Sequence, residues 1–196
     1  MLLSEVSKTI DIKKILNQKS NKHFNKINSS SKEVDKKTIF IIDSKKKIKR
    51  EYIDEAIKRK IPAIITNKIY HQLPLFQIVV KDIEKETQKL LTSLKPFKPI
   101  NTVAITGTNG KTSVAWYISE ICRLNNIKIK MQGTLGYYVN GKKIKNGSLT
   151  TPTYETLHQN GFSKIKNKYN FVFEASSHAL HQDRIKKYPI NIAAIT

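Results

Sequence analysis

The sequence predicts an α/β protein: a small N-terminal α/β domain followed by a truncated, mostly parallel, doubly wound central domain. First, short apolar runs of strand length alternate with segments of helical periodicity along the whole chain. Second, two prolines within Lys95–Pro99 interrupt both periodicities and separate domains 1–95 and 99–196. Third, a glycine-rich turn follows the first apolar run of the second domain and leads directly into an amphipathic segment. We therefore expect two α/β domains with the glycine-rich turn in the second.

The first domain is expected to alternate strands and helices. Strands are predicted at Thr38–Ile42, Pro62–Thr66 and Leu75–Val80, and helices at Glu51–Arg59 and Asp82–Leu94. The second helix begins with acidic residues, which suit the positive end of a helix dipole. The run Lys45–Lys47 between the first strand and helix is typical of a solvated turn.

The second domain continues the alternation. Strands are predicted at Thr102–Ile105, Ile127–Met131, Tyr169–Ala175 and Ile190–Thr196, a hairpin at Tyr137–Ile144 around Asn140-Gly141, and helices after the glycine-rich turn and from Thr151-Pro152. Tyr154, Leu157, Phe162 and Ile165 would form the apolar side of the second helix. Such a series implies a parallel sheet with the glycine-rich turn at the carboxyl edge of its first strand.

Composition excludes several classes of function. Of the 36 basic residues only four are arginine, and no arginine forks interleave with aromatics as base-reading surfaces require. The net charge of +21 is therefore read as a solvated lysine coat, which favours polyanionic substrates, and no nucleic-acid partner is expected. We find neither a signal-peptide pattern nor an apolar run that could span a bilayer, so we expect no membrane association and a cytoplasmic protein. The single cysteine, Cys122, fits a core position in a reducing compartment.

The glycine-rich turn is the strongest functional signal. Gly107, Thr108, Asn109, Gly110, Lys111, Thr112 and Ser113 stand between the predicted strand and helix. Backbone N–H groups in such a turn and the helix N-terminus bind phosphates, and this predicts an ATP site. Lys111 would reach the β- and γ-phosphates, and the Thr112 hydroxyl would ligate Mg²⁺. The motif departs from the common P-loop pattern, whose first glycine would fall at Ile105.

A carboxylate is predicted beside this turn. Glu174 comes at the carboxyl end of a buried strand, where doubly wound sheets place their ligands. A buried carboxylate needs a positive partner, which Mg²⁺ shared with Thr112 and the nucleotide would supply. Lys111 and Glu174 are thus the expected catalytic residues. The alternatives are that Glu174 caps the following helix or pairs with a lysine.

Two further stretches offer polar side chains at helix starts. Thr150 and Thr151 precede a proline, and from the residues alone capping by Thr151 is the favoured interpretation. Ser176, Gln182 and Arg184 follow the strand that carries Glu174. The planar guanidinium of Arg184 suits a carboxylate or a pyrophosphate. His178 lacks an obvious orienting carboxylate, and we interpret it as structural.

These motifs together resemble the Mur ligase family, which builds the peptide stem of peptidoglycan. The resemblance extends from about Pro99 to Thr196. It is carried by the loop Gly107–Thr112, the stretches Gly133–Tyr137 and Leu149–Pro152, and the stretch Glu174–Arg184. It implies that ATP and Mg²⁺ are the cofactors, with Glu174 as magnesium ligand. It also implies that Thr150, Thr151, Ser176, Gln182 and Arg184 contact the muramoyl-peptide substrate.

The N-terminal domain resembles the family less closely. Family members carry an Asp-Ser-Arg signature that contacts the uridine, and the equivalent here is Ser30-Ser31-Lys32. Only Ser31 matches. The resemblance therefore implies uridine binding through Ser31 alone, while an ordinary loop is the alternative.

Within the family, the motifs are most similar to those of members that add a diamino acid to UDP-N-acetylmuramoyl-L-alanyl-D-glutamate. The implied partners are that substrate and meso-diaminopimelate or L-lysine, and a monomer is expected. Family enzymes are more than twice as long, so we expect this chain to be a fragment, inactive alone. The alternatives are another Mur or folylpolyglutamate-type ligase, or a non-catalytic ATP- or UDP-sugar-binding module.

Overall fold

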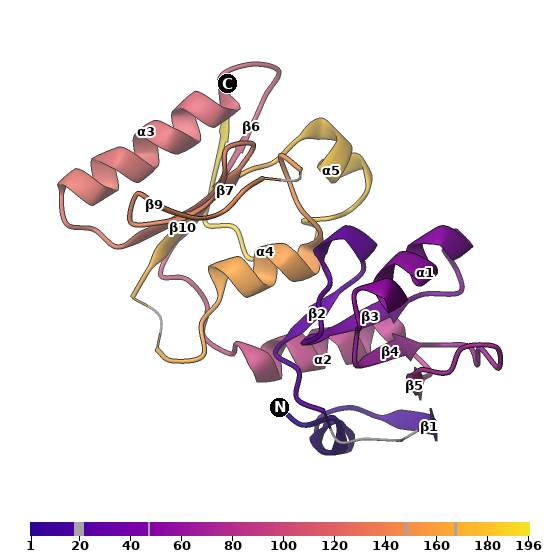
Figure 1. Ribbon diagram of the computed structural model, residues 1–196. Coiled ribbons are helices and arrows are strands. Elements are labelled where there is room, and N and C mark those ends of the chain that lie inside the picture. Colours follow the sequence, from indigo (N-terminus) through magenta and orange to yellow (C-terminus); the bar gives the residue numbers. More distant parts are fainter. Residues whose placement is uncertain (18–21, 47, 148, 167) are drawn as a thin grey trace. The chain divides into compact units, whose positions relative to one another are not determined.

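The structure, a computed structural model, describes residues 1–17, 22–46, 48–147, 149–166 and 168–196. These residues form two compact units, Met1–Leu94 and Lys95–Thr196. Each unit has its own sheet, and both sheets carry helices (Figure 1). The predicted α/β class, with a mostly parallel second sheet, is confirmed. Among the helices of the described ranges, none has both the length and the apolar character needed to cross a bilayer.

The first unit contains strands β1 (Ile12–Leu16), β2 (Lys26–Asn28), β3 (Thr38–Ile42), β4 (Ala63–Thr66) and β5 (Phe76–Val80), and helices α1 (Arg50–Lys58) and α2 (Ile83–Leu94). Short 3-10 helices, η1 (Leu3–Lys8) and η2 (Ser31–Glu33), complete it. The strand order is β1-β5-β4-β3-β2, with β2 to β5 parallel and β1 antiparallel to β5. The strands and helices expected here are confirmed within about a residue. Lys45 and Lys46 are exposed in a turn, and Lys47 lies outside the described residues.

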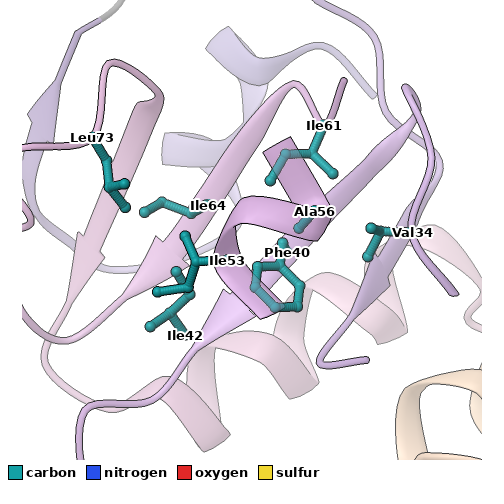
Figure 2. Close-up of a cluster of buried hydrophobic side chains, with 8 residues drawn as sticks. All are labelled: Val34, Phe40, Ile42, Ile53, Ala56, Ile61, Ile64 and Leu73. Carbon is teal, nitrogen blue, oxygen red and sulfur yellow. The ribbon is translucent and has the colours of Figure 1, made fainter. Parts of the chain in front are cut away.

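Helix α1 covers one face of this sheet. Ile53 and Ala56 of the helix pack against Phe40 and Ile42 of β3 and against Ile64 of β4 (Figure 2). All five residues of β3 are buried, as expected for a parallel strand that is covered on both faces. Burial of this continuous apolar run, more than local propensity, holds the strand in the centre of the sheet.

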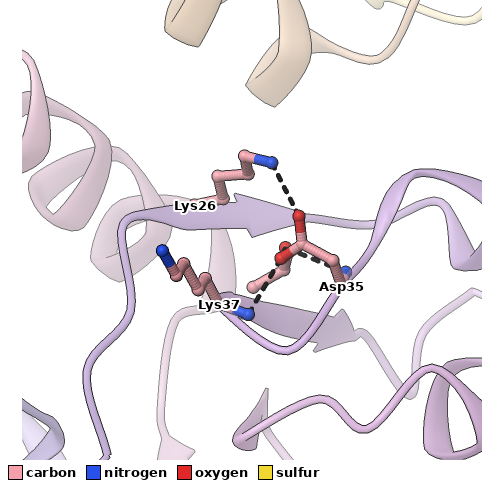
Figure 3. Close-up of polar contacts among 4 residues, drawn as sticks. Lys26, Asp35 and Lys37 are labelled. Carbon is pink, nitrogen blue, oxygen red and sulfur yellow. Dashed lines mark hydrogen bonds and ion pairs between the residues drawn. The ribbon is translucent and has the colours of Figure 1, made fainter.

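The turn between β2 and β3 is closed by a carboxylate. Asp35 accepts hydrogen bonds from Lys26 Nζ at 2.7 Å and from the Lys37 amide at 2.8 Å (Figure 3). Burial raises the pKa of Asp35, but these hydrogen bonds and the one from Thr38 outweigh it, and the pKa lies below its usual value. The contact fixes the start of β3, since Thr38 is its first residue.

The second unit contains strands β6 (Thr102–Thr106), β7 (Ile129–Gly133), β8 (Gly136–Val139), β9 (Lys142–Lys145), β10 (Asn170–Glu174) and β11 (Ile192–Ile195), and helices α3 (Lys111–Leu124), α4 (Tyr154–Gly161) and α5 (Ser177–His181). The order is β11-β6-β10-β7-β8-β9. The first four strands in this order are parallel, and β8 and β9 form the predicted hairpin.

Alternating side chains of the central strands build a core on each face of this sheet. On one face Ala104, Phe171 and Phe173 pack against Leu157 of α4. On the other face Ile105 and Val172 pack with Ala115 of α3. This two-sided burial confirms the doubly wound prediction. It also brings the carboxyl ends of β6, β10 and β7 together, because these strands are parallel neighbours.

Two local predictions are wrong. Thr151 does not cap a helix: α4 begins at Tyr154, and its N-cap is Thr153, whose hydroxyl accepts from the Thr156 amide. The helix ends at Gly161, so Phe162 and Ile165 lie beyond it, and Ile165 is 79% exposed. Cys122 of α3 is half-buried and packs against the core on the face of the sheet that α3 covers, so its expected core position is confirmed in part.

Candidate functional site

The glycine-rich loop lies at the carboxyl end of β6, as predicted. Gly107 and Gly110 have φ angles of +135° and +79°, which L side chains rarely adopt. Gly110 is the N-cap of α3, and Lys111 is the first helical residue. Thr108, Asn109 and Ser113 are exposed. The loop thus places the N-terminal amides of a 14-residue helix beside a turn whose backbone conformation favours glycine.

The Lys111 ammonium folds back over this loop. Its Nζ donates to the carbonyl oxygen of Gly107 at 2.6 Å and to that of Thr108 at 3.2 Å. A flexible ammonium can exchange such carbonyl partners for phosphate oxygens, which are fully charged acceptors. The loop therefore already holds a cation at the helix N-terminus, where an anion is favoured.

Glu174 is the last residue of β10 and lies beside the loop. The residue is only 2% exposed. Oε2 accepts from the Thr112 hydroxyl at 2.9 Å, and Oε1 accepts from the Thr134 amide at 2.8 Å. No lysine or arginine of the described ranges forms an ion pair with Glu174. Capping of α5 is performed by Ser176, which accepts from the Ala179 amide. Neither alternative role for Glu174 is therefore seen.

The pair Thr112 and Glu174 suits a hard divalent cation. Mg²⁺ binds oxygen ligands at 2.0–2.1 Å in an octahedron, so adjacent ligand oxygens lie roughly 3 Å apart. The 2.9 Å between Thr112 Oγ1 and Glu174 Oε2 matches that spacing. No cluster of three or more histidine, cysteine or acidic side chains is found in the described part of the chain. A cation held here would depend on phosphate oxygens for further ligands, as is usual for Mg²⁺ at nucleotide sites.

The structure brings the predicted substrate residues together next to Glu174. Arg184 donates from Nη1 to the Thr151 carbonyl oxygen at 2.8 Å, and from Nε and Nη2 to Gln182 Oε1 at 2.9 and 2.6 Å. The Thr151 hydroxyl donates to the Glu174 carbonyl oxygen and accepts from the Ser176 amide. Thr150 and Arg184 are half-buried and Gln182 is exposed, so part of this group is open to solvent.

Two residues of the site, Gly133 and Thr134, contributed to the resemblance but were not predicted as site residues. Thr134 donates to both carboxylate oxygens of Glu174, the hydroxyl to Oε2 at 3.1 Å and the amide to Oε1. A Cβ at Gly133 would lie 2.0 Å from Glu174 Oε1. The signal in the sequence is a Gly-Thr pair at the carboxyl end of a strand, and only the strand order places this pair beside Glu174.

Ser31, the predicted uridine contact, lies in the first unit. It is the first residue of η2, it is buried, and its hydroxyl donates to Glu55 Oε2 of α1 at 2.5 Å. This bond lowers the pKa of Glu55, with a further contribution from Arg59. A role of Ser31 in uridine binding therefore stays a prediction.

Burial lowers the pKa of two basic side chains near the C-terminal end of α4, Lys130 and His158. The ammonium of Lys130 donates to the Gly161 carbonyl oxygen at 3.0 Å, and burial, with a smaller effect of Lys95, lowers its pKa to about 8. His158 stacks on Phe162 with ring centroids 3.9 Å apart. Burial, again with a smaller effect of Lys95, lowers the pKa of His158 to about 4. These groups lie at the face of the sheet that α4 covers, and we treat them as structural.

Fold and loop together define an α/β protein with a P-loop-like unit at the carboxyl edge of a parallel sheet. Residues 105–196 match the family model of the Mur ligase middle domain. A Rickettsia montanensis UDP-N-acetylmuramoyl-L-alanyl-D-glutamate–2,6-diaminopimelate ligase is 32% identical over 166 residues, 83% of this chain and 35% of that protein. The enzyme of that name from Buchnera aphidicola is 33% identical over 159 residues, 81% of this chain and 28% of its own. The chain belongs to the Mur ligase family.

Solved structures show the same fold. A UDP-N-acetylmuramoyl-L-alanyl-D-glutamate–2,6-diaminopimelate ligase superimposes with a TM-score of 0.60 at 23% identity, over 100% of this chain and 40% of that chain. The MurF ligase of Thermotoga maritima, solved in complex with ADP, gives a TM-score of 0.52 at 19% identity. The match covers 87% of this chain and 36% of the MurF chain. The chain thus spans about a third of the length of the curated relatives it matches.

Proposed function

We propose that this chain carries the nucleotide- and muramoyl-peptide-binding parts of an ATP-dependent ligase of peptidoglycan precursor synthesis. The reaction would add a diamino acid, meso-diaminopimelate or L-lysine, to UDP-N-acetylmuramoyl-L-alanyl-D-glutamate. The names of the relatives support this reaction. The observation that carries the proposal is the placement of Thr112 and Glu174, 2.9 Å apart, beside the glycine-rich loop. Because ATP and UDP-linked precursors are cytoplasmic, we propose that the chain acts in the cytoplasm.

In this proposal the loop binds ATP. The amides of the stretch Gly107–Ser113 and the N-terminus of α3 bind phosphate oxygens, and Lys111 exchanges its carbonyl partners for the β- and γ-phosphates. Thr112 and Glu174 would hold Mg²⁺. When bound, this ion would supply positive charge that offsets the negative charge of the phosphates.

The peptide substrate is then activated as an acyl phosphate. A carboxylate oxygen of the D-glutamate attacks the γ-phosphorus, and the bond to the ADP oxygen breaks. The diamino-acid amine attacks the acyl carbon, loses a proton, and expels inorganic phosphate to form the amide. Thr150, Ser176, Gln182 and Arg184 would bind the muramoyl peptide beside the loop, and Thr151 would present its backbone there.

No side-chain nucleophile is required by this sequence of steps. The contribution of the chain is to align carboxylate and γ-phosphate and to stabilise the charge that moves between them. Lys111 is the residue best placed for the second role, because its ammonium is already held at the loop. The rate therefore depends on its charge rather than on a proton transfer.

Nucleotide binding is the step that tests this assignment directly. Calorimetric titration of the purified chain with ATP and Mg²⁺ should show binding that Lys111→Ala abolishes, since the phosphates lose their main side-chain counterion. Lys128→Ala, which removes an exposed lysine of the same unit away from the loop, is the matched control and should bind like wild type. Equal affinity of wild type and Lys111→Ala would refute the ATP site.

A further inference from the structure

Thr134 is the first residue after β7, and β7 is paired in parallel with β10. The residue therefore stands at the carboxyl edge of the sheet next to Glu174, although forty residues separate the two in sequence. Its backbone amide and its side-chain hydroxyl both contact the Glu174 carboxylate.

The direction of these hydrogen bonds follows from the chemistry of the groups. An ionised carboxylate only accepts, so the Thr134 amide donates to Oε1 at 2.8 Å and the Thr134 hydroxyl donates to Oε2 at 3.1 Å. A hydroxyl has one proton, so at its 3.0 Å contact with Thr150 Oγ1 Thr134 is the acceptor and Thr150 the donor. A chain of hydrogen bonds thus runs from Thr150 through Thr134 to the carboxylate.

We propose that Thr134 is a positioning residue that holds Glu174 toward Thr112 and links this carboxylate to the substrate segment at Thr150. The proposal rests on the proposed function, because it takes Glu174 as the ligand of the nucleotide-bound Mg²⁺. With Oε1 held by the amide and Oε2 by the hydroxyl, the carboxylate cannot rotate away from Thr112 without losing both bonds. The carboxylate is thus oriented before the cation arrives, which reduces the cost of ordering it on binding.

Gly133 supplies the space that this arrangement needs. A Cβ there would lie 2.0 Å from Glu174 Oε1 and 2.7 Å from Cδ, distances at which the carboxylate must move. The position has no positive φ angle, so the requirement for glycine is the close approach of Glu174 and not the backbone conformation. Gly133→Ala and a substitution of Thr134 should therefore disturb the same carboxylate by independent means.

The test separates nucleotide binding with metal from binding without it. ATP affinity of the purified chain is measured by calorimetry in Mg²⁺ and in EDTA, and the ratio of the two is the gain from the metal. Thr134→Val should reduce this gain about tenfold, because one hydrogen bond to a buried, charged group is lost. Affinity in EDTA should not change, and Thr134→Ser should restore the gain. Gly133→Ala should reduce the gain at least as much.

The controls distinguish positioning from general damage. Thr102→Val makes the same substitution at the opposite, amino end of β6, and its metal-dependent gain should equal that of wild type. Glu174→Gln should reduce the gain more than Thr134→Val does. If Thr134→Val keeps the full metal-dependent gain while the separate variant Glu174→Gln loses it, the positioning role is overturned and the proposed function stays intact. A full gain in Glu174→Gln would instead overturn the metal assignment of the proposed function.

Discussion

The Thr151 hydroxyl donates a 2.7 Å hydrogen bond to the backbone carbonyl oxygen of Glu174, and both residues are buried. The same hydroxyl oxygen accepts from the Ser176 amide at 2.9 Å. One side chain therefore satisfies two backbone groups at the end of β10, where the strand pairing stops. Thr151 thereby fixes the geometry of the strand end that carries Glu174.

We expect Thr151→Val to destabilise the second unit by about 1–3 kcal/mol, because the buried Glu174 carbonyl and the half-buried Ser176 amide lose their partner. Urea unfolding followed by the fluorescence of Trp116, the single tryptophan of the chain, reports on this unit. Thr151→Ser keeps the hydroxyl and should remain close to wild type. A Thr151→Val chain as stable as wild type would show that the two backbone groups find other partners.

Arg184 is clamped between two of the residues that the resemblance assigned to the substrate. Its guanidinium contacts the Thr151 carbonyl oxygen and the Gln182 side chain. Lysine cannot reproduce three donors in a fixed plane. Arg184→Lys should therefore weaken binding of UDP-N-acetylmuramoyl-L-alanyl-D-glutamate about tenfold in a calorimetric titration, while ATP affinity stays unchanged.

The matched control is Arg123→Lys, on the exposed side of α3, where the arginine pairs with Glu120. This variant should bind both ligands like wild type. Loss of ATP affinity in Arg184→Lys with unchanged substrate affinity would mean that Arg184 serves the nucleotide and not the muramoyl peptide.

Gly161 ends α4 against the aromatic core of the second unit. A Cβ at this position would lie 2.1 Å from Tyr188 Oη and 2.9 Å from Phe171 Cδ1. Gly161→Ala should therefore cost about 1–3 kcal/mol of unfolding free energy through overpacking. In the background of Tyr188→Phe, which removes Oη, the same substitution should cost less. Equal costs in the two backgrounds would mean that Tyr188 is not the obstacle.

The sequence predicted strands and turns correctly where the hydrophobic periodicity and the turn residues indicate the same element. Long apolar runs such as Thr38–Ile42 and Tyr169–Ala175 predicted buried strands, and β3 and β10 lie within them. Asn140-Gly141 predicted the β8–β9 hairpin, in which both residues have positive φ. The glycine-rich loop was placed correctly because its strand and helix are adjacent in sequence.

Other features depend on contacts that sequence order does not reveal. β1 contains Lys13 and Lys14 between apolar residues, and it shows no alternation because it lies at the edge of the sheet, beside β5. Thr151 and Thr153 are equally good caps by residue type, and only the position of the Thr156 amide selects Thr153. Thr134 meets Glu174 because β10 inserts between β6 and β7, a strand order that no local pattern encodes.

His158 is another such residue, because its neighbours come from distant parts of the chain. It is 1% exposed, and its Nδ1 has no hydrogen-bond partner among the described residues. Burial, with a smaller effect of Lys95, lowers the pKa of His158 from 6.5 to about 4. Between these values the unfolded chain binds a proton that the folded chain does not, so stability falls as the pH decreases.

The contribution of neutral His158 to the free energy of unfolding should therefore be complete above pH 6.5, and it should disappear as the pH falls toward 4. The loss is on the order of 3 kcal/mol over the whole window. Urea unfolding monitored by Trp116 at pH 7 and pH 4.5 should show the second unit less stable at the lower pH, and His158→Phe should remove most of that difference. His71→Phe, which replaces an exposed histidine of the first unit, should retain the wild-type difference. If His158→Phe keeps the full pH dependence, another group causes it and His158 is not buried in its neutral form.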